Sequence, residues 1–187
     1  ARVILDGDVD LPPKTAALSS KQVRQLTGRY TLADGGSLTA APANGALVIT
    51  PEGQDAYSAI FPGPPLSKEA ASRTASSIKA AIENSIRGDH ALLQRALSDG
   101  MSPDQVKQMA ESRWRELQGE HGVFTSLDVL GVIPAGRGAA VILRYNFAEG
   151  TTYARYLMRG DSIRGARGLS APPTAACTPS APRSSGT

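Results

Sequence analysis

Residues 26–61 read LTGRYTLADGGSLTAAPANGALVITPEGQDAYSAIF, and this stretch decides how the chain is organised. Short runs of β-favouring residues alternate in it with the Gly, Asn and Asp residues that tight turns prefer. The Asn-Gly pair at 44–45 is the strongest hairpin signal, and the Asp-Gly-Gly run at 34–36 supplies another turn. We therefore predict an antiparallel β-meander of four strands here, with its fourth strand at 54–61.

Composition limits the classes of protein to which the chain can belong. Of its 187 residues, 41% are hydrophobic and 20% are charged, which is typical of a globular protein with a packed core. The formal net charge of +3 is too small, and the arginines are too dispersed, for a nucleic-acid-binding surface. We therefore expect no nucleic acid among the partners. No apolar run is long enough to predict a membrane span.

The sequence offers little reactive chemistry. Cys177 is the single cysteine, which excludes an internal disulfide framework and a cysteine-based zinc site. Ser76 and Lys79 match the S-x-x-K nucleophile motif, but its companion motifs are missing, so we interpret the pair as part of a solvated helix face. His90 and His121 each lie at an expected helix end, where a structural role explains them. We expect no catalytic residue, no metal site and no cofactor in this chain.

Two proline-rich stretches frame the meander. Residues 1–25 indicate a linker or strap, because the Pro-Pro pair at 12–13 favours extended backbone. The serines at 19–20 are suited to cap a short helical turn that ends near residue 26. The Pro-Gly-Pro-Pro run at 62–65 predicts a second linker. The opening run ARVILDGDVD looks like a cut made within a longer polypeptide.

Residues 66–168 carry the pattern of an α+β domain. Fourfold spacing of isoleucines predicts a helix that stops at Gly88, and a second helix follows it before residue 99. The Ser-Pro pair at 102–103 begins a third helix. Four strands are then predicted, at 123–133, 139–148, 151–159 and 162–166.

A block of helices followed by a block of antiparallel strands is an α+β layout. We expect the helices to pack on a curved, cone-like antiparallel sheet. From 169 to 187, Pro, Ser, Thr and Ala dominate, which predicts a disordered tail.

Aromatic side chains of this domain are candidates for a binding pocket between the helices and the curved sheet. They are Trp114, Tyr145, Phe147, Tyr153 and Tyr156. Small-molecule pockets are commonly apolar with a few polar groups, and these residues can supply both. The alternative is that the same side chains fill a solid core.

The meander region resembles a known family. The proline strap, the run QLTGRY at 25–30 and the run ALVI at 46–49 are similar to motifs in the lipocalin-like C-terminal appendage of serine β-lactamase-like hydrolases. These hydrolases are esterases and peptidases related to the penicillin-binding proteins. The resemblance implies a larger hydrolase whose catalytic Ser, Lys and Tyr lie upstream of residue 1.

A second resemblance covers residues 68–167. The run AAIENSIRGDHALLQRAL at 80–97, followed by a further helix and antiparallel strands, is similar in layout to the superfamily of nuclear transport factor and ketosteroid isomerase. Members have a cone-shaped fold and often serve as ligand-binding or dimerising modules. Those that are enzymes carry acid and base residues inside the cone. The resemblance therefore implies a cone that binds a small molecule or a partner.

The expected function is that of a non-catalytic accessory region of a larger serine hydrolase. The meander would act as a brace or lid on the upstream catalytic domain. The α+β half would bind a small apolar molecule or a partner, a second copy of the chain included. We expect a periplasmic or extracellular location, with the cytoplasm as the alternative.

Two other functions stay open from the sequence. One is a cone-fold enzyme acting on a small apolar molecule, with Tyr145 and His121 reaching into the cavity. The other is a structural dimerisation module. A cavity with an ionisable group at its base would favour the enzyme, and a solid core would contradict both an enzyme and a ligand-binding protein.

Overall fold

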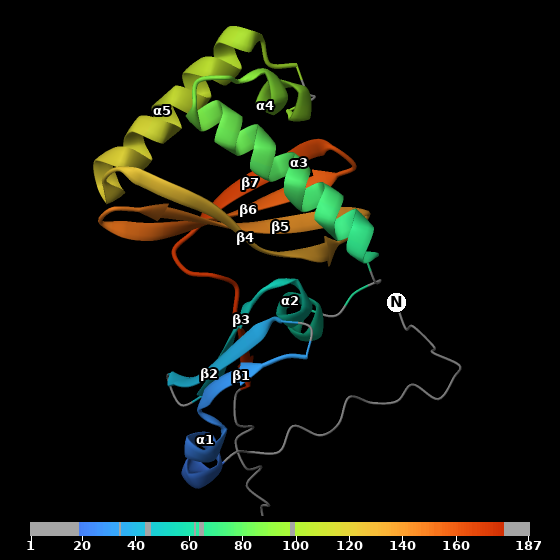
Figure 1. Ribbon diagram of the computed structural model, residues 1–187, viewed down its shortest axis with the longest axis vertical. Helices are drawn as coiled ribbons and strands as arrows, with labels where there is room; N and C mark the ends of the chain where they lie inside the picture. Colours follow the sequence, from blue (N-terminus) through green and yellow to red (C-terminus); the bar gives the residue numbers. More distant parts are fainter. Residues whose placement is uncertain are drawn as a thin grey trace, which may run out of the picture.

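The computed structural model describes residues 19–33, 35–43, 46–61, 63, 66–97 and 100–177. Within them the chain forms two antiparallel sheets that lie one above the other (Figure 1). The first sheet contains, in spatial order, β1 (Gly28–Thr31), β2 (Ser37–Ala43), β3 (Ala46–Glu52) and β8 (Ala175–Cys177). The second contains, in order, β4 (Phe124–Ala135), β5 (Gly138–Phe147), β6 (Gly150–Arg159) and β7 (Ser162–Leu169).

Helices cover the second sheet on both faces. In the described part of the chain the helices are α1 (Ser20–Leu26), α2 (Gln54–Ile60), α3 (Lys68–Ile86), α4 (Ala91–Ala96) and α5 (Pro103–His121). The last three lie over one face of the second sheet, α2 lies between the two sheets, and α1 lies at the opposite end of the molecule from α5 (Figure 1). The predicted α+β class, with helices packed on an antiparallel sheet, is confirmed.

The prediction of a fourth meander strand at 54–61 is wrong, because most of this segment forms α2. Gly53 turns the chain with a φ of +90°, in the region that favours glycine. Apolar residues then recur at 56, 57, 60 and 61, which fits one face of a helix better than alternation does. Tyr57 and Phe61, one helical turn apart, stack with their ring centroids 5.8 Å apart. Burial of this face against the second sheet makes the segment helical.

The fourth strand of the first sheet comes from the other end of the chain. After β7 the chain crosses back to the first sheet, where β8 pairs antiparallel with β3 and Ala175 lies opposite Ile49 (Figure 1). The prediction of a disordered tail from 169 is therefore wrong as far as residue 177. This pairing covers the edge of β3, which the meander alone would leave open.

Several predicted linker and tail residues lie outside the described part of the chain. They are residues 1–18 of the strap, residues 62, 64 and 65 of the second linker, and residues 178–187 of the tail. The remainder of the strap includes α1, whose first turn is closed by a capping box between Ser19 and Gln22. The predicted helical turn after 19–20 is thus confirmed.

The helices and strands predicted within residues 66–168 are confirmed. Ser67 caps α3, and a positive φ at Gly88 ends the turn that follows it. Ser102 and Gln105 form a capping box at the start of α5, where Pro103 occupies the first turn. β7 continues beyond its predicted end to Leu169. These signals are local in the chain, which explains why the sequence alone revealed them.

The second sheet is buried on both faces. Along β5, Val141 and Leu143 pack beneath the helices in the same core as Ile78 of α3. Ile142, between them, points to the opposite face and packs against Tyr57 of α2. Alternate side chains of a strand point to opposite faces, so a strand this uniformly apolar fits a position between two layers.

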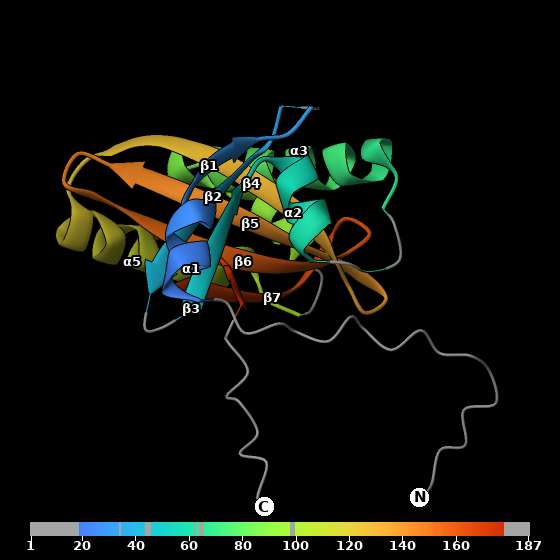
Figure 2. The ribbon, with the colours of Figure 1, turned by 90° about the horizontal axis from the view of Figure 1, so that it is seen from below.

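The first sheet is attached to the second through the free edge of β4. Seen from below, the first sheet and α2 lie across the second sheet (Figure 2). The Gly53 amide donates to the Leu130 carbonyl oxygen at 3.1 Å. The Gln54 side chain pairs with Val132, where Nε2 donates to the carbonyl oxygen at 2.8 Å and Oε1 accepts from the amide at 2.7 Å. These bonds satisfy main-chain groups that an edge strand leaves unpaired.

Candidate functional site

A cavity of about 690 Å³ lies between the helices and the inner face of the second sheet. Its size is within the range of small-molecule pockets in proteins. Much of its wall is apolar, and the apolar residues in it include Ile82, Leu93, Leu97, Trp114, Leu117 and Ile163. The α+β half is therefore hollow rather than solid.

Small residues on β6 and β7 create the hollow. The register of the two strands places Ala166 opposite Tyr156 and Gly168 opposite Ala154. These positions belong to the cavity wall, and apart from Tyr156 they carry a methyl group or no side chain. Over this part of the sheet, the strands therefore present no long side chains to the helices, and space is left between the two layers.

Two tyrosines supply a polar group in this wall. The hydroxyl oxygens of Tyr145 on β5 and Tyr156 on β6 are 2.9 Å apart. Burial raises the pKa of Tyr145 well above its ordinary value, and the neighbouring Tyr156 raises it further. Burial also raises the pKa of Tyr156, although the hydrogen bond with Tyr145 opposes that shift. Both hydroxyls are therefore neutral at physiological pH, and once one donates to the other, a single O–H proton is left for an acceptor.

His90 lies in the cavity wall at the start of α4. Its Nδ1 is 2.9 Å from the Ser85 hydroxyl oxygen, across the turn between α3 and α4. Its buried Nε2 has no hydrogen-bond partner among the described residues, and the nearest carboxylate oxygen, Oε1 of Glu111, is 4.0 Å away. The sequence indicated only a helix-end role for His90. The predicted stop at Gly88 was the one signal that the chain reverses here and brings the two helix ends together.

The structure divides the predicted pocket aromatics between three environments. Trp114, Tyr145 and Tyr156 lie in the cavity wall. Phe147 lies behind Trp114, with 5.7 Å between the ring centroids, and does not line the cavity. Tyr153 borders the cavity along β6, but its ring packs on the opposite face of the sheet, in the cluster around α2.

His121, expected to reach into a cavity in the enzyme alternative, does not line this one. Its ring packs against Phe147, with the centroids 5.5 Å apart, and its Nε2 lies 3.6 Å from a Glu120 carboxylate oxygen. At the end of α5 it occupies the helix-terminal position that the sequence indicated.

Charged side chains border the cavity unevenly. Arg113, on α5, is half exposed, and its Nη1 donates to Oε2 of Glu116 at 2.6 Å. The same side chain extends to β7, since a Cβ built on Gly168 would lie 3.6 Å from Arg113 Nη2. Glu111, two residues earlier on α5 and also in the wall, lies 4.0 Å from Nζ of Lys107. The arginine therefore extends from α5 to β7, the edge strand of the sheet.

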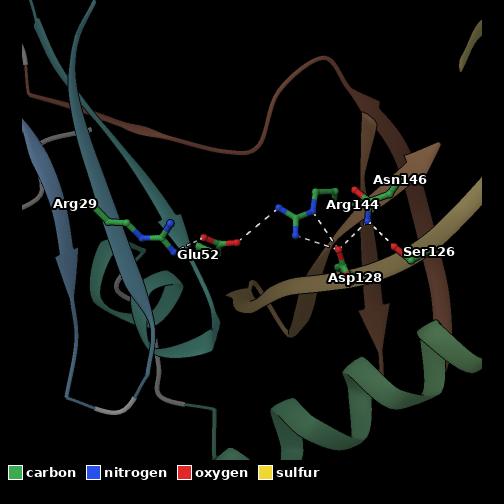
Figure 3. A network of polar contacts seen from close by, with 6 residues as sticks. All are labelled: Arg29, Glu52, Ser126, Asp128, Arg144 and Asn146. Atoms are coloured by element: carbon green, nitrogen blue, oxygen red, sulfur yellow. Dashed lines mark hydrogen bonds and ion pairs between the residues drawn. The ribbon is translucent and has the colours of Figure 1, made fainter. Parts of the chain in front are cut away.

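A second polar feature crosses the joint between the two sheets (Figure 3). Arg144 on β5 donates to Oδ2 of Asp128 from Nη2 at 3.0 Å and from Nε at 3.2 Å. Its Nη1 lies 3.6 Å from Oε1 of Glu52 on β3, and Glu52 accepts from Arg29 at 3.1 Å. Positive and negative groups alternate along this network, which suits a structural joint rather than a reactive centre.

Hydrogen bonds set the protonation of the network. Partial burial alone would raise the pKa of Asp128, but hydrogen bonds from Asn146 and Arg144 hold that pKa below its usual range. Burial likewise opposes the charge of Arg144, yet the bonds to Asp128 raise the pKa of the guanidinium. Both groups are therefore charged over the ordinary pH range, and the joint stays paired.

No set of three His, Cys, Asp or Glu side chains capable of holding a metal ion gathers in the part of the chain that the structure describes. Among the helices of that part, none is long and apolar enough to cross a membrane. Comparisons with protein-family models, curated proteins and solved structures find no match for the chain. The cavity and the joint are the two features from which a function can be inferred.

Proposed function

We propose that this chain is a non-catalytic accessory region of a larger serine hydrolase, and that its second half binds a small, largely apolar molecule. The cavity of about 690 Å³, open beside a buried tyrosine pair, carries the proposal. The hydrolase as parent is supported by the resemblance of the runs at 25–30 and 46–49 to the appendages of such enzymes.

The cavity wall supports binding of a molecule with an apolar body. Trp114 and the leucines of α4 and α5 offer apolar surface that a ligand would remove from water, at roughly 25 cal/mol for each Å² buried. The spare O–H of the Tyr145–Tyr156 pair can orient that ligand by donating to one acceptor atom.

The position of the first sheet supports a brace rather than a lid. The cavity opens on the helical side of the second sheet, whereas α2 and the meander contact the opposite face. Gln54 and the Arg144–Glu52 contact fix the meander at this face. A segment attached there is placed to hold the sheet, and with it the cavity floor, against a neighbouring domain.

A cone-fold enzyme is the second candidate, and the unpartnered Nε2 of His90 in the cavity wall is the observation that favours it. Burial keeps both wall tyrosines protonated, so neither is a ready base at neutral pH. The one carboxylate of the wall, Glu111, is half exposed and interacts with Lys107. The cavity wall therefore supports ligand binding better than it supports catalysis.

Trp114 makes the binding proposal directly testable, because it is the single tryptophan of the chain and lies in the cavity wall. Titration of the full chain with a neutral apolar probe such as 1-decanol is expected to change its emission saturably and to raise the melting temperature. Ala154→Leu, which fills the cavity, should abolish both effects. Ala59→Leu, on the exposed side of α2, should preserve them.

A linear, non-saturating response in the wild type, or an unchanged affinity in Ala154→Leu, would contradict the proposal. An enzyme acting on the probe would consume it over time. Loss of that consumption in His90→Ala with binding intact would then favour the enzyme.

A further inference from the structure

Cationic side chains outnumber anionic ones in the cavity wall. Residues 155–167, RYLMRGDSIRGAR, contain four arginines and one aspartate, a net charge of +3 that equals the formal charge of the whole chain. This segment forms half of β6 and most of β7, the strands that border the cavity. Arg155 lies opposite Ile142, and Arg167 lies opposite Arg155, so both point to the face of the sheet that contacts α2. The cavity wall keeps Arg113 and Arg164 against a single carboxylate, Glu111. The electrostatic potential at the opening therefore favours an anion.

Arg113 is the cation best placed to meet a ligand. Nη1 of its guanidinium contacts Glu116, whereas Nη2 is directed to β7 beside Gly168. Because residue 168 has no side chain, this position of β7 leaves space beside that nitrogen. The guanidinium can therefore turn a second face to a group entering between α5 and β7 without giving up Glu116.

Arg113 and the tyrosine pair belong to one end of the cavity. Nη2 of Arg113 lies beside Gly168, which is two residues from Ala166, the position opposite Tyr156. Consistent with this placement, the charge of Arg113 lowers the pKa of both Tyr145 and Tyr156, against the larger effect of burial. The cavity thus has a polar end with a cation and a spare O–H donor, while much of its other surface is apolar and His90 and Glu111 lie elsewhere in the wall.

We infer that the cavity takes an amphiphile with one negative charge, whose apolar body lies against Trp114 and whose carboxylate meets Arg113 at the opening. This inference rests on the proposed binding function and specifies the chemistry of the ligand. A guanidinium suits a carboxylate because two parallel N–H donors match its two oxygens, and such charge-assisted bonds are stronger than neutral ones.

A matched pair of probes separates this inference from the proposed function. Decanoate and 1-decanol share their chain length and differ in the charge of the head group. Below their aggregation concentrations, Trp114 emission and calorimetry with the full chain are expected to show about tenfold tighter binding of decanoate at low salt. The preference should weaken as salt is added, because ions screen the exposed guanidinium.

Variants of α5 assign the preference to one residue. Arg113→Gln should remove the preference for decanoate and leave the affinity for 1-decanol unchanged. Arg115→Gln, on the same helix but outside the cavity wall, should preserve both affinities. Glu116→Gln releases Nη1 of Arg113 and is expected to tighten decanoate binding several-fold, a gain that misfolding cannot produce.

The outcomes are distinct. If neither probe binds, the proposed function fails and this inference fails with it. If 1-decanol binds as tightly as decanoate, the cavity binds ligands but the anionic specificity is wrong. If the preference survives in Arg113→Gln, with the melting temperature unchanged, the assignment to Arg113 is wrong.

Discussion

Tyr57 joins the two halves of the molecule through a single ring. The side chain is fully buried, and its ring lies so close over β4 that a Cβ at Gly131 would stand 2.5 Å from its Cγ. Its hydroxyl is buried and has no hydrogen-bond partner among the described residues. The residue thus combines tight packing with an unsatisfied polar atom, and each property has a measurable consequence.

Close packing predicts that positions 57 and 131 are energetically coupled. Gly131→Ala should lower the free energy of unfolding by about 1–3 kcal/mol, because the added methyl group displaces the ring. Tyr57→Ala should lower it by about 3–5 kcal/mol. In the Tyr57→Ala background, Gly131→Ala should have little effect, so urea unfolding of the four proteins should give a coupling energy above about 1 kcal/mol.

Gly119→Ala is the control for this cycle. A Cβ there would meet nothing within 4 Å, and the position lies inside α5, so the substitution should raise stability by about 0.4–1 kcal/mol. Additive effects of the substitutions at 57 and 131 would show that the ring does not rest on this glycine.

Burial of Tyr57 also predicts a loss of stability at alkaline pH. Burial, the largest cause, raises the pKa of its hydroxyl from 10.0 to about 12. Between these values the unfolded chain releases a proton that the folded chain keeps, so the free energy of unfolding falls as pH rises through this interval. Tyr57→Phe should remove part of that slope, while Tyr145 and Tyr156, with pKa values raised in the same direction, retain the rest.

Urea unfolding at increasing pH measures the slope. Tyr30→Phe serves as the control, because that hydroxyl is exposed and donates to the Leu26 carbonyl oxygen at 2.8 Å. An alkaline slope of Tyr57→Phe equal to that of the wild type would contradict the prediction.

At the scale of elements, α2 and β4 are joined by a side chain that imitates a strand. The Gln54 amide offers one donor and one acceptor to Val132, as a neighbouring strand would. The Gly53 amide adds a main-chain bond to the same edge. The turn from β3 into α2 therefore caps β4, and β4 needs no further strand on that side.

Loss of this cap should weaken the joint. Gln54→Ala leaves both main-chain groups of Val132 without a partner and should lower the free energy of unfolding by about 1–3 kcal/mol. Gln108→Ala, on the exposed face of α5, should stay within about 0.5 kcal/mol of the wild type. Equal stability of the two variants in urea unfolding would show that the edge is satisfied in another way.

At the scale of the whole molecule, the first half of the chain is completed by its last described residues. The chain leaves the first sheet after α2, builds the second sheet with its helices, and returns as β8 to pair with β3. The two sheets are therefore connected twice: the first sheet combines strands from both ends of the described chain, whereas the second sheet and the helices over it come from one continuous stretch. Two connections hold the sheets in a fixed relative position, which is what the proposed brace requires.

Removal of β8 should loosen the first sheet selectively. Deletion of residues 171–187 exposes the edge of β3, so amide hydrogen exchange in β3 should become faster while exchange in β5, at the centre of the second sheet, is unchanged. Deletion of residues 178–187 alone retains β8 and is the matched control. Equal exchange of β3 in the two deletions would show that β8 contributes no protection.

Local signals explain how much of the fold was predictable. Capping residues such as Ser102, the stop at Gly88 and the hairpin turns at 148–149 and 160–161 act on neighbours in the chain. The strand prediction for 54–61 was wrong because the helical spacing of its apolar residues covers only about two turns, and contact with β4 stabilises the helix. The pairing of Ala175 with Ile49 could not be predicted from the sequence, because the two residues are distant in the chain and neither belongs to a local pattern that indicates a partner.

The candidate site, like the fold, was only partly predictable from the sequence. Periodicity and capping are local properties, and they were sufficient to predict an α+β fold with helices over an antiparallel sheet and aromatic residues near its inner face. Contacts between distant segments turn Tyr153 away from Tyr145 and Tyr156, place His90 in the wall and leave a cavity, and none of these could be predicted. A cavity results from small side chains, here those at 154, 166 and 168, that distant helices do not fill, and an absence of atoms leaves no pattern in a sequence.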